Sequence, residues 1–93
     1  MINPKQRLRV KPSIIYTELD NKEAVLLNFE TKYFYRLNEA GVRIWQLLDG
    51  KKTIGEITDA IVDEYDVDKD KAFASVNRQI KKLIKEKMVE ITA

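Results

Sequence analysis

The apolar residues change their spacing at Asn38, and this change limits the fold more than any other feature of the sequence. Before it lie three runs rich in β-branched and aromatic residues: 13–19, 24–29 and 32–37. Such runs favour strands, and in the second one Val25, Leu27 and Phe29 share a face by the two-residue period. Because the connections between the runs are short, an antiparallel three-stranded meander is predicted.

After Asn38 the apolar residues recur every three or four positions, as they do along amphipathic helices. The pattern predicts three helices, over 39–48, 54–65 and 69–87. Typical capping residues precede them: Asn38, then Thr53 with Glu56 as a capping box, then Asp68. The order βββααα is that of an α+β domain, in which the three-stranded antiparallel sheet packs on a three-helix unit.

Two glycines mark the first helix. Gly41 lies in its first turn, where glycine is less stabilising than alanine by about 1 kcal/mol. We therefore expect another backbone to approach closely at this position. Asp49 and Gly50 end the helix, and Gly50 is expected in the left-handed conformation. Trp45, in the apolar stripe of the same helix, is expected in the core.

The two ends of the chain are predicted to differ from each other. Residues 1–12 contain alternating basic residues and two prolines, which favours a flexible basic N-terminal arm. This arm is either an ordinary ragged terminus or a segment that contacts a partner. Residues 13–91 form the folded domain, in which Met88, Val89 and Ile91 make a short extended tail.

Composition excludes most kinds of catalytic site. The 93 residues suit one domain, and they include no cysteine and no histidine. Disulfides, thiolate nucleophiles, Cys/His zinc sites and imidazole acid–base chemistry are therefore excluded. The acidic cluster at 63–70 lacks the ligand spacing of a calcium loop, and there is no glycine-rich phosphate loop. We expect a binding protein that is not an enzyme and that uses no cofactor or metal.

The chain is also expected to be soluble and cytoplasmic. Hydrophobic residues make up 44% and charged residues 34% of it, as in soluble globular proteins. No stretch approaches the roughly 18 apolar residues of a membrane span. The basic N-terminus lacks the apolar segment of a signal peptide.

The charges are unevenly distributed although the net charge is only +2. Residues 53–68 hold six acids and no base, whereas residues 69–87 hold seven bases against Asp70 and Glu86. One interpretation is solubility together with favourable placement of charges in the helix dipoles. The other is attraction of an anionic partner, which is either an acidic peptide or nucleic acid.

The ordered residues across the three helices resemble the PqqD family. The matching stretch is YRLNEAGVRIWQLLDGKKTIGEI, followed by the acidic link DEYDVD and by FASVNRQIKKLIKEKMVEI. The positions that match the family's motif are Leu37-Asn38, Gly41, Ile44-Trp45, Leu48, Asp49-Gly50, Thr53, Glu56-Ile57 and Tyr65. The resemblance covers about residues 13–91 and does not extend to 1–12.

The resemblance implies a winged-helix-like βββααα fold that recognises the leader segments of ribosomally synthesised and post-translationally modified peptides (RiPPs). In such domains the leader adds as a strand to the third strand of the sheet, in a groove against the third helix. The domain, acting as a peptide chaperone, presents the precursor to a modifying enzyme. Implied partners are the precursor peptide and a radical-SAM enzyme or, in lasso-peptide systems, a leader peptidase. The family serves several pathways, so the product need not be pyrroloquinoline quinone (PQQ).

An open sheet edge supports strand addition without the family, because its backbone groups are available for pairing. The predicted peptide contacts on the third strand are Lys32, Tyr33, Phe34, Tyr35 and Arg36. Those on the third helix are Ala72, Phe73, Val76, Asn77 and Ile80, with Arg78 and Lys81 as charge contacts. The alternative role, as core residues, is open for Tyr33, Tyr35, Phe73, Val76 and Ile80. Phe34 lies opposite Leu37 in the strand period and is expected to be exposed.

Two alternative functions fit the pattern less well. In a winged-helix DNA-binding regulator the third helix would enter the major groove and the basic arm would follow the phosphates. The dispersed basic residues and the low net charge argue against it. In a structural subunit the open strand edge would pair with a second copy, whereas a leader-binding domain is expected to be a monomer.

Overall fold

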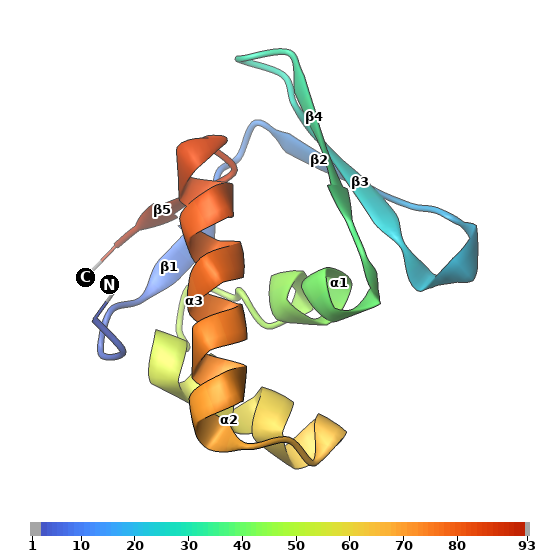
Figure 1. Cartoon of the computed structure of the whole chain (residues 1–93). Helices are drawn as coiled ribbons and strands as arrows, with labels where there is room; N and C mark the ends of the chain where they lie inside the picture. Colours follow the sequence, from blue (N-terminus) through green and yellow to red (C-terminus); the bar gives the residue numbers. More distant parts are fainter. Residues whose placement is uncertain (1–2, 93) are drawn as a thin grey trace.

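The three strands predicted before Asn38 form one antiparallel sheet (Figure 1). The computed structural model describes residues 3–92. Its sheet consists of β2 (Ile14–Glu18), β3 (Ala24–Asn28) and β4 (Tyr33–Leu37). The order is β2-β3-β4, and a short 3₁₀ helix, η1 (Asp20–Lys22), connects β2 to β3. Because β3 is central, β4 keeps one edge that no strand in the described part of the chain pairs with.

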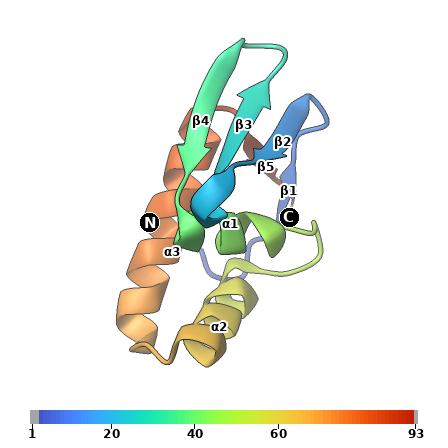
Figure 2. The same ribbon diagram turned by 90° about the vertical axis from the view of Figure 1, so that its right-hand side faces the viewer.

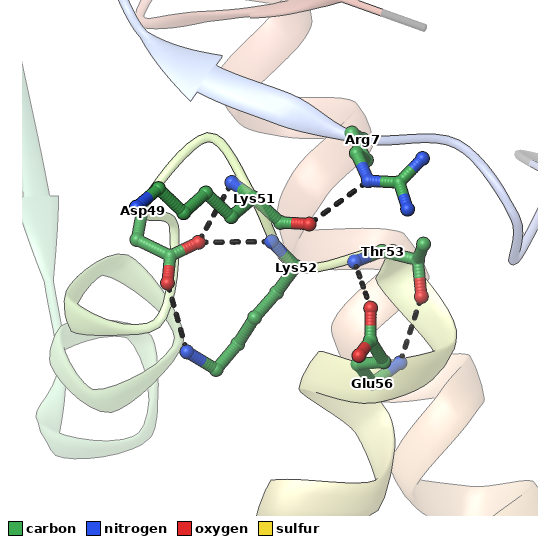
Figure 3. Close-up of polar contacts among 6 residues, drawn as sticks. All are labelled: Arg7, Asp49, Lys51, Lys52, Thr53 and Glu56. Carbon is green, nitrogen blue, oxygen red and sulfur yellow. Dashed lines mark hydrogen bonds and ion pairs between the residues drawn. The ribbon is translucent and has the colours of Figure 1, made fainter.

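Three helices follow the sheet: α1 (Glu39–Gln46), α2 (Ile54–Tyr65) and α3 (Lys69–Lys85). All three predicted caps form, including the capping box of Thr53 and Glu56, whose reciprocal hydrogen bonds are drawn in Figure 3. The βββααα order and the α+β class are thus confirmed. Of the helices described here, none is long and apolar enough to cross a membrane.

Two helices end two residues earlier than predicted, and local backbone geometry explains both ends. After α1, the Asp49 carboxylate accepts hydrogen bonds from the backbone N–H groups of Lys51 and Lys52, which turns the chain (Figure 3). Gly50 within this turn has φ +81°, the predicted left-handed conformation. After α3, Lys87 has φ +59°, which is incompatible with a continuing helix.

The core lies between the inner face of the sheet and the helices, and Figure 2 shows α1 and α2 below the sheet. On β3 the buried positions are Ala24, Leu26 and Asn28, so the other set of alternating residues faces outward. Trp45 is buried as predicted. The largest fully buried apolar side chains come from both sheets and from all parts of the chain: Leu8, Leu26, Leu37, Ile54, Ile57, Ile80, Leu83 and Met88.

The N-terminal segment is not the flexible arm that the sequence predicted. Residues Leu8–Val10 form β1, which pairs antiparallel with β5 (Val89–Ile91) in a separate two-stranded sheet. Leu8 is only 1% exposed, and Arg9 forms an ion pair with Glu90. The physical reason is that Leu8 and Val10 alternate with basic residues. The segment is therefore highly charged overall, although its two apolar side chains lie on the same side of a strand. Residues 1 and 2 lie outside the described residues. The predicted C-terminal extended tail is confirmed as β5.

Gly41 has a different role from the predicted one. A Cβ atom at this position would lie 3.2 Å from the Asn38 Oδ1 atom and 3.3 Å from the Leu37 Cδ2 atom. The tight neighbours are therefore the capping side chain and a core leucine rather than another backbone. The Asn38 Oδ1 atom also accepts the Gly41 N–H at 2.8 Å. Glycine thus leaves room for the cap that joins β4 to α1.

Candidate functional site

The free edge of β4 carries two strongly exposed aromatic residues. Phe34 is 70% exposed on the outer face of the sheet, as predicted, and Tyr33 is 61% exposed. Tyr35 shares the inner face with Tyr33 but is half-buried against the core. The edge therefore offers unpaired backbone groups together with aromatic side chains on both faces.

A cleft of about 340 Å³ opens where the three helices meet. Its lining is mostly apolar and includes Ala40 and Ile44 of α1, Ile61 and Tyr65 of α2, and Ala72 and Val76 of α3. Because Ala40 is in the first turn of α1, the cleft begins next to the end of β4.

Asn28 fixes the distance between the sheet and α3. It is 1% exposed, and its amide donates to the carbonyl of Lys87 at 2.8 Å, just after α3 ends. Its Oδ1 atom accepts from the backbone N–H groups of Glu30 and Thr31 in the turn between β3 and β4. One buried side chain thus ties the turn before β4 to the residues just after α3.

An ion pair fixes the end of α2, where Tyr65 borders the cleft. The Arg43 guanidinium donates to both carboxylate oxygens of Glu64, at 2.7 and 2.9 Å. This hydrogen bonding lowers the pKa of Glu64 and raises that of Arg43.

On the sheet, burial raises the pKa of Tyr16, and the Glu18 carboxylate beside it adds to the effect. Within residues 3–92 no group of acidic side chains is arranged to hold a metal ion.

The predicted contacts on β4 and the turn before it are accessible. Tyr33, Phe34 and Arg36 are exposed, and the Arg36 guanidinium also forms an ion pair with Glu23. Lys32 lies in the turn with φ +65°, and its ammonium group is 5.5 Å from the centre of the Phe29 ring.

The predicted contacts on α3 separate into four groups. Ala72 and Val76 are buried but line the cleft. Ile80 is 0% exposed and Asn77 is also buried, so both belong to the interior. Phe73 lines a different cavity, with Pro4 and Gly55, and does not border the cleft. Arg78 and Lys81 are exposed.

Sequence reasoning missed the part of the cleft that α1 and α2 form. Ile44, Ile61 and Tyr65 are not among the predicted contacts, although all three line the cleft and Tyr65 is 43% exposed. On α3 it missed Lys71 and Ser75, which line the cleft beside Ala72. The available signal was the spacing, because Lys71 and Ser75 are four residues apart and therefore lie on the same side of the helix.

Comparisons with known proteins give one family match and several similar structures. Residues 23–89 match the model of a family described as "Coenzyme PQQ synthesis protein D (PqqD)". A comparison with curated proteins gives no match. Among solved structures, TbiB1 in complex with the TbiA(beta) leader peptide is 30% identical with a TM-score of 0.80. That alignment covers 91% of this chain and 98% of TbiB1.

Two further solved structures share the fold. A lasso peptide synthetase B1 complexed with the leader peptide is 21% identical, with a TM-score of 0.78 over 90% of this chain and 98% of the other. The heterocyclase TruD is 17% identical, with a TM-score of 0.66 over 95% of this chain but only 12% of TruD. The same fold therefore also occurs as a small part of a much longer chain.

Proposed function

This chain belongs to the PqqD family, and we therefore propose that it binds the leader segment of a ribosomally synthesised precursor peptide. The observation that carries the proposal is the similarity to TbiB1, whose structure contains a leader peptide and whose chain aligns with 91% of this one at 30% identity. The free β4 edge and the adjoining apolar cleft supply the backbone groups and the pocket that an extended peptide needs.

In the proposed complex the leader adds to β4 as a fourth strand of the sheet and lies in the groove against α3. Its main chain pairs with the β4 backbone, and its side chains alternate between the two faces. Tyr33 and Tyr35 contact the side chains on the inner face, while Phe34 contacts those on the outer face. Ala72 and Val76 receive an apolar leader residue in the cleft.

The domain presents the bound precursor to a separate modifying enzyme and performs no chemistry itself. A radical-SAM enzyme and a leader peptidase are the two classes of partner that the family suggests. Support comes from the composition, because the chain has no histidine or cysteine with which to carry out acid–base or nucleophilic steps. Since the leader occupies the β4 edge, the complex contains one domain per peptide and no dimer through that edge.

Calorimetry with synthetic peptides encoded beside this chain's gene tests the proposal. We expect one of them to bind one-to-one with a dissociation constant in the low micromolar range or below. The competing function, a DNA-binding regulator, predicts affinity for duplex DNA that falls steeply as salt rises. Absence of binding by every neighbouring short peptide, together with such DNA binding, contradicts the proposal.

A further inference from the structure

One side of α3 carries three exposed basic residues that form no ion pair within the described part of the chain. Lys71, Arg78 and Lys82 are exposed, and with Ser75 they recur at intervals of four, three and four residues. This spacing places them along one side of the helix, which we call the open flank. The open flank borders the cleft, because Lys71 and Ser75 line it together with Ala40 at the start of α1.

The described residues contain no ion pair to any of the three cations. The one ion pair on α3 joins Lys69 to Asp59, on a different side of the helix. Glu86 follows Lys82 by one turn but forms no ion pair with it. The chain has 15 acidic residues, yet none in the described part pairs with these three cations. The positive potential of the open flank is therefore available to a ligand.

The inner face of β4 carries no charge of its own. The residues of β4 that share the inner face are Tyr33, Tyr35 and Leu37. A bound strand therefore meets tyrosines on one side and cations on the other. An acidic side chain directed at α3 would gain a charge-assisted contact, whereas a basic one would be repelled.

We propose that the leader recognised by this domain carries acidic residues at alternate positions, which face Arg78 and Lys82. One helical turn separates these two cations by about 6 Å along the helix axis. Alternate residues of an extended strand are about 6.8 Å apart, so two carboxylates at i and i+2 match the pair. Lys71 lies two turns further toward the start of α3, at the rim of the cleft. The inference rests on the proposed function and adds the chemical class of the leader.

This charge selection complements backbone pairing. Main-chain hydrogen bonds to β4 accept almost any sequence, and the cleft distinguishes only apolar size. The cations on α3 add discrimination by charge. Because all three are solvent-exposed, each contact has a modest effect on affinity. A larger part of the effect falls on the association rate and on its dependence on salt.

The experiment uses the leader peptide that binds in calorimetry and a second version in which its acidic residues are changed to glutamine. The protein variants are Arg78→Gln with Lys82→Gln, and a matched control, Lys5→Gln with Lys51→Gln, which makes the same change in net charge at exposed positions away from the groove. Fluorescence anisotropy gives affinities, and stopped flow gives association rates at two salt concentrations.

We expect the Arg78/Lys82 variant to bind the acidic leader about fivefold more weakly and the control to bind it within a factor of two. With the glutamine version of the leader, the two variants should bind equally. Equal loss in both variants, or a binding leader without acids two residues apart, overturns this inference while the proposed function stands. If no leader binds and the Arg78/Lys82 variant instead loses affinity for duplex DNA, the proposed function and this inference both fail.

Discussion

The two flanks of α3 differ in what covers them. On one flank, which we call the covered flank, Phe73 borders a cavity with Pro4 and Gly55, and the Pro4 carbonyl accepts the Gly55 N–H at 2.9 Å. The open flank, with Lys71 and Arg78, is exposed and borders the cleft between the helices. The N-terminal segment thus packs near one side of the helix, whereas the side chains proposed to contact the leader remain solvent-exposed on the other.

The largest expected effect concerns the segment that reaches the covered flank. Leu8→Ala removes a side chain that is only 1% exposed, so the free energy of unfolding should fall by about 3 kcal/mol. The matched control is Ile91→Ala, because Ile91 is the register partner of Leu8 on β5 but is 44% exposed. It should cost less than about 1 kcal/mol. Urea denaturation measures both, and equal small losses would contradict a structural role for β1.

The next effect concerns Asn28, whose side chain links the turn before β4 to the end of α3. Asn28→Ala leaves the Lys87 carbonyl and the turn amides without their buried partner, which should destabilise the domain by about 2 kcal/mol. Leader binding should weaken as well, because this side chain no longer holds β4 and α3 in position relative to each other. Ser13→Ala, which removes only a 3.3 Å contact to the same Asn28 oxygen, serves as control. Unchanged stability and affinity in Asn28→Ala would show that this link is dispensable.

Substitutions of Phe34 and Phe73 compare the β4 edge with the covered flank. Phe34→Ala should leave stability within about 0.5 kcal/mol, because the ring is 70% exposed, yet weaken leader binding roughly tenfold. Phe73→Ala should do the reverse, with lower stability and nearly unchanged affinity in the folded protein. Calorimetry measures the leader affinity of both variants, and urea midpoints measure their stability. Loss of affinity in Phe73→Ala alone would place the peptide on the covered flank.

The smallest effect is a pH dependence at the turn beside the N-terminal segment (Figure 3). The Lys52 ammonium and the backbone N–H groups of Lys52 and Lys51 hold the pKa of Asp49 well below its usual range. Because the folded pKa is lowered, this carboxylate contributes stability above its unfolded pKa of about 3.9, and the contribution is lost as pH falls toward the folded value. Asp49→Asn should therefore be less stable than the natural protein at pH 6, with a smaller difference at pH 3. A constant difference in urea midpoint would contradict this assignment.

Local signals in the sequence were enough to predict the helices and the meander. The bounds of α2 follow from its capping box and apolar stripe, and the exposure of Phe34 follows from the strand period. These features depend on residues close together in the chain. The strand Leu8–Val10 was missed because its partner, β5, lies about 80 residues away and its own three residues are too few to show a period.

The site was predicted less completely than the fold, for a related reason. Spacing of three and four residues identifies the apolar stripe of α3, but it does not tell which neighbour packs on each side of that stripe. Phe73 and Ser75 are only two residues apart, yet one borders the covered flank and the other the cleft. That division depends on where the N-terminal segment and α1 pack, which no local pattern encodes.

The central claim is that the leader pairs with β4 and contacts the open flank of α3. The most direct test is to record amide shifts of ¹⁵N-labelled protein during titration with the leader that binds in calorimetry. We predict that the shifts concentrate at residues 32–37 and along α3 at 71–82, with new protection of β4 amides from hydrogen exchange. Shifts that concentrate instead at residues 8–10 and 89–91, with β4 unchanged, would contradict the account.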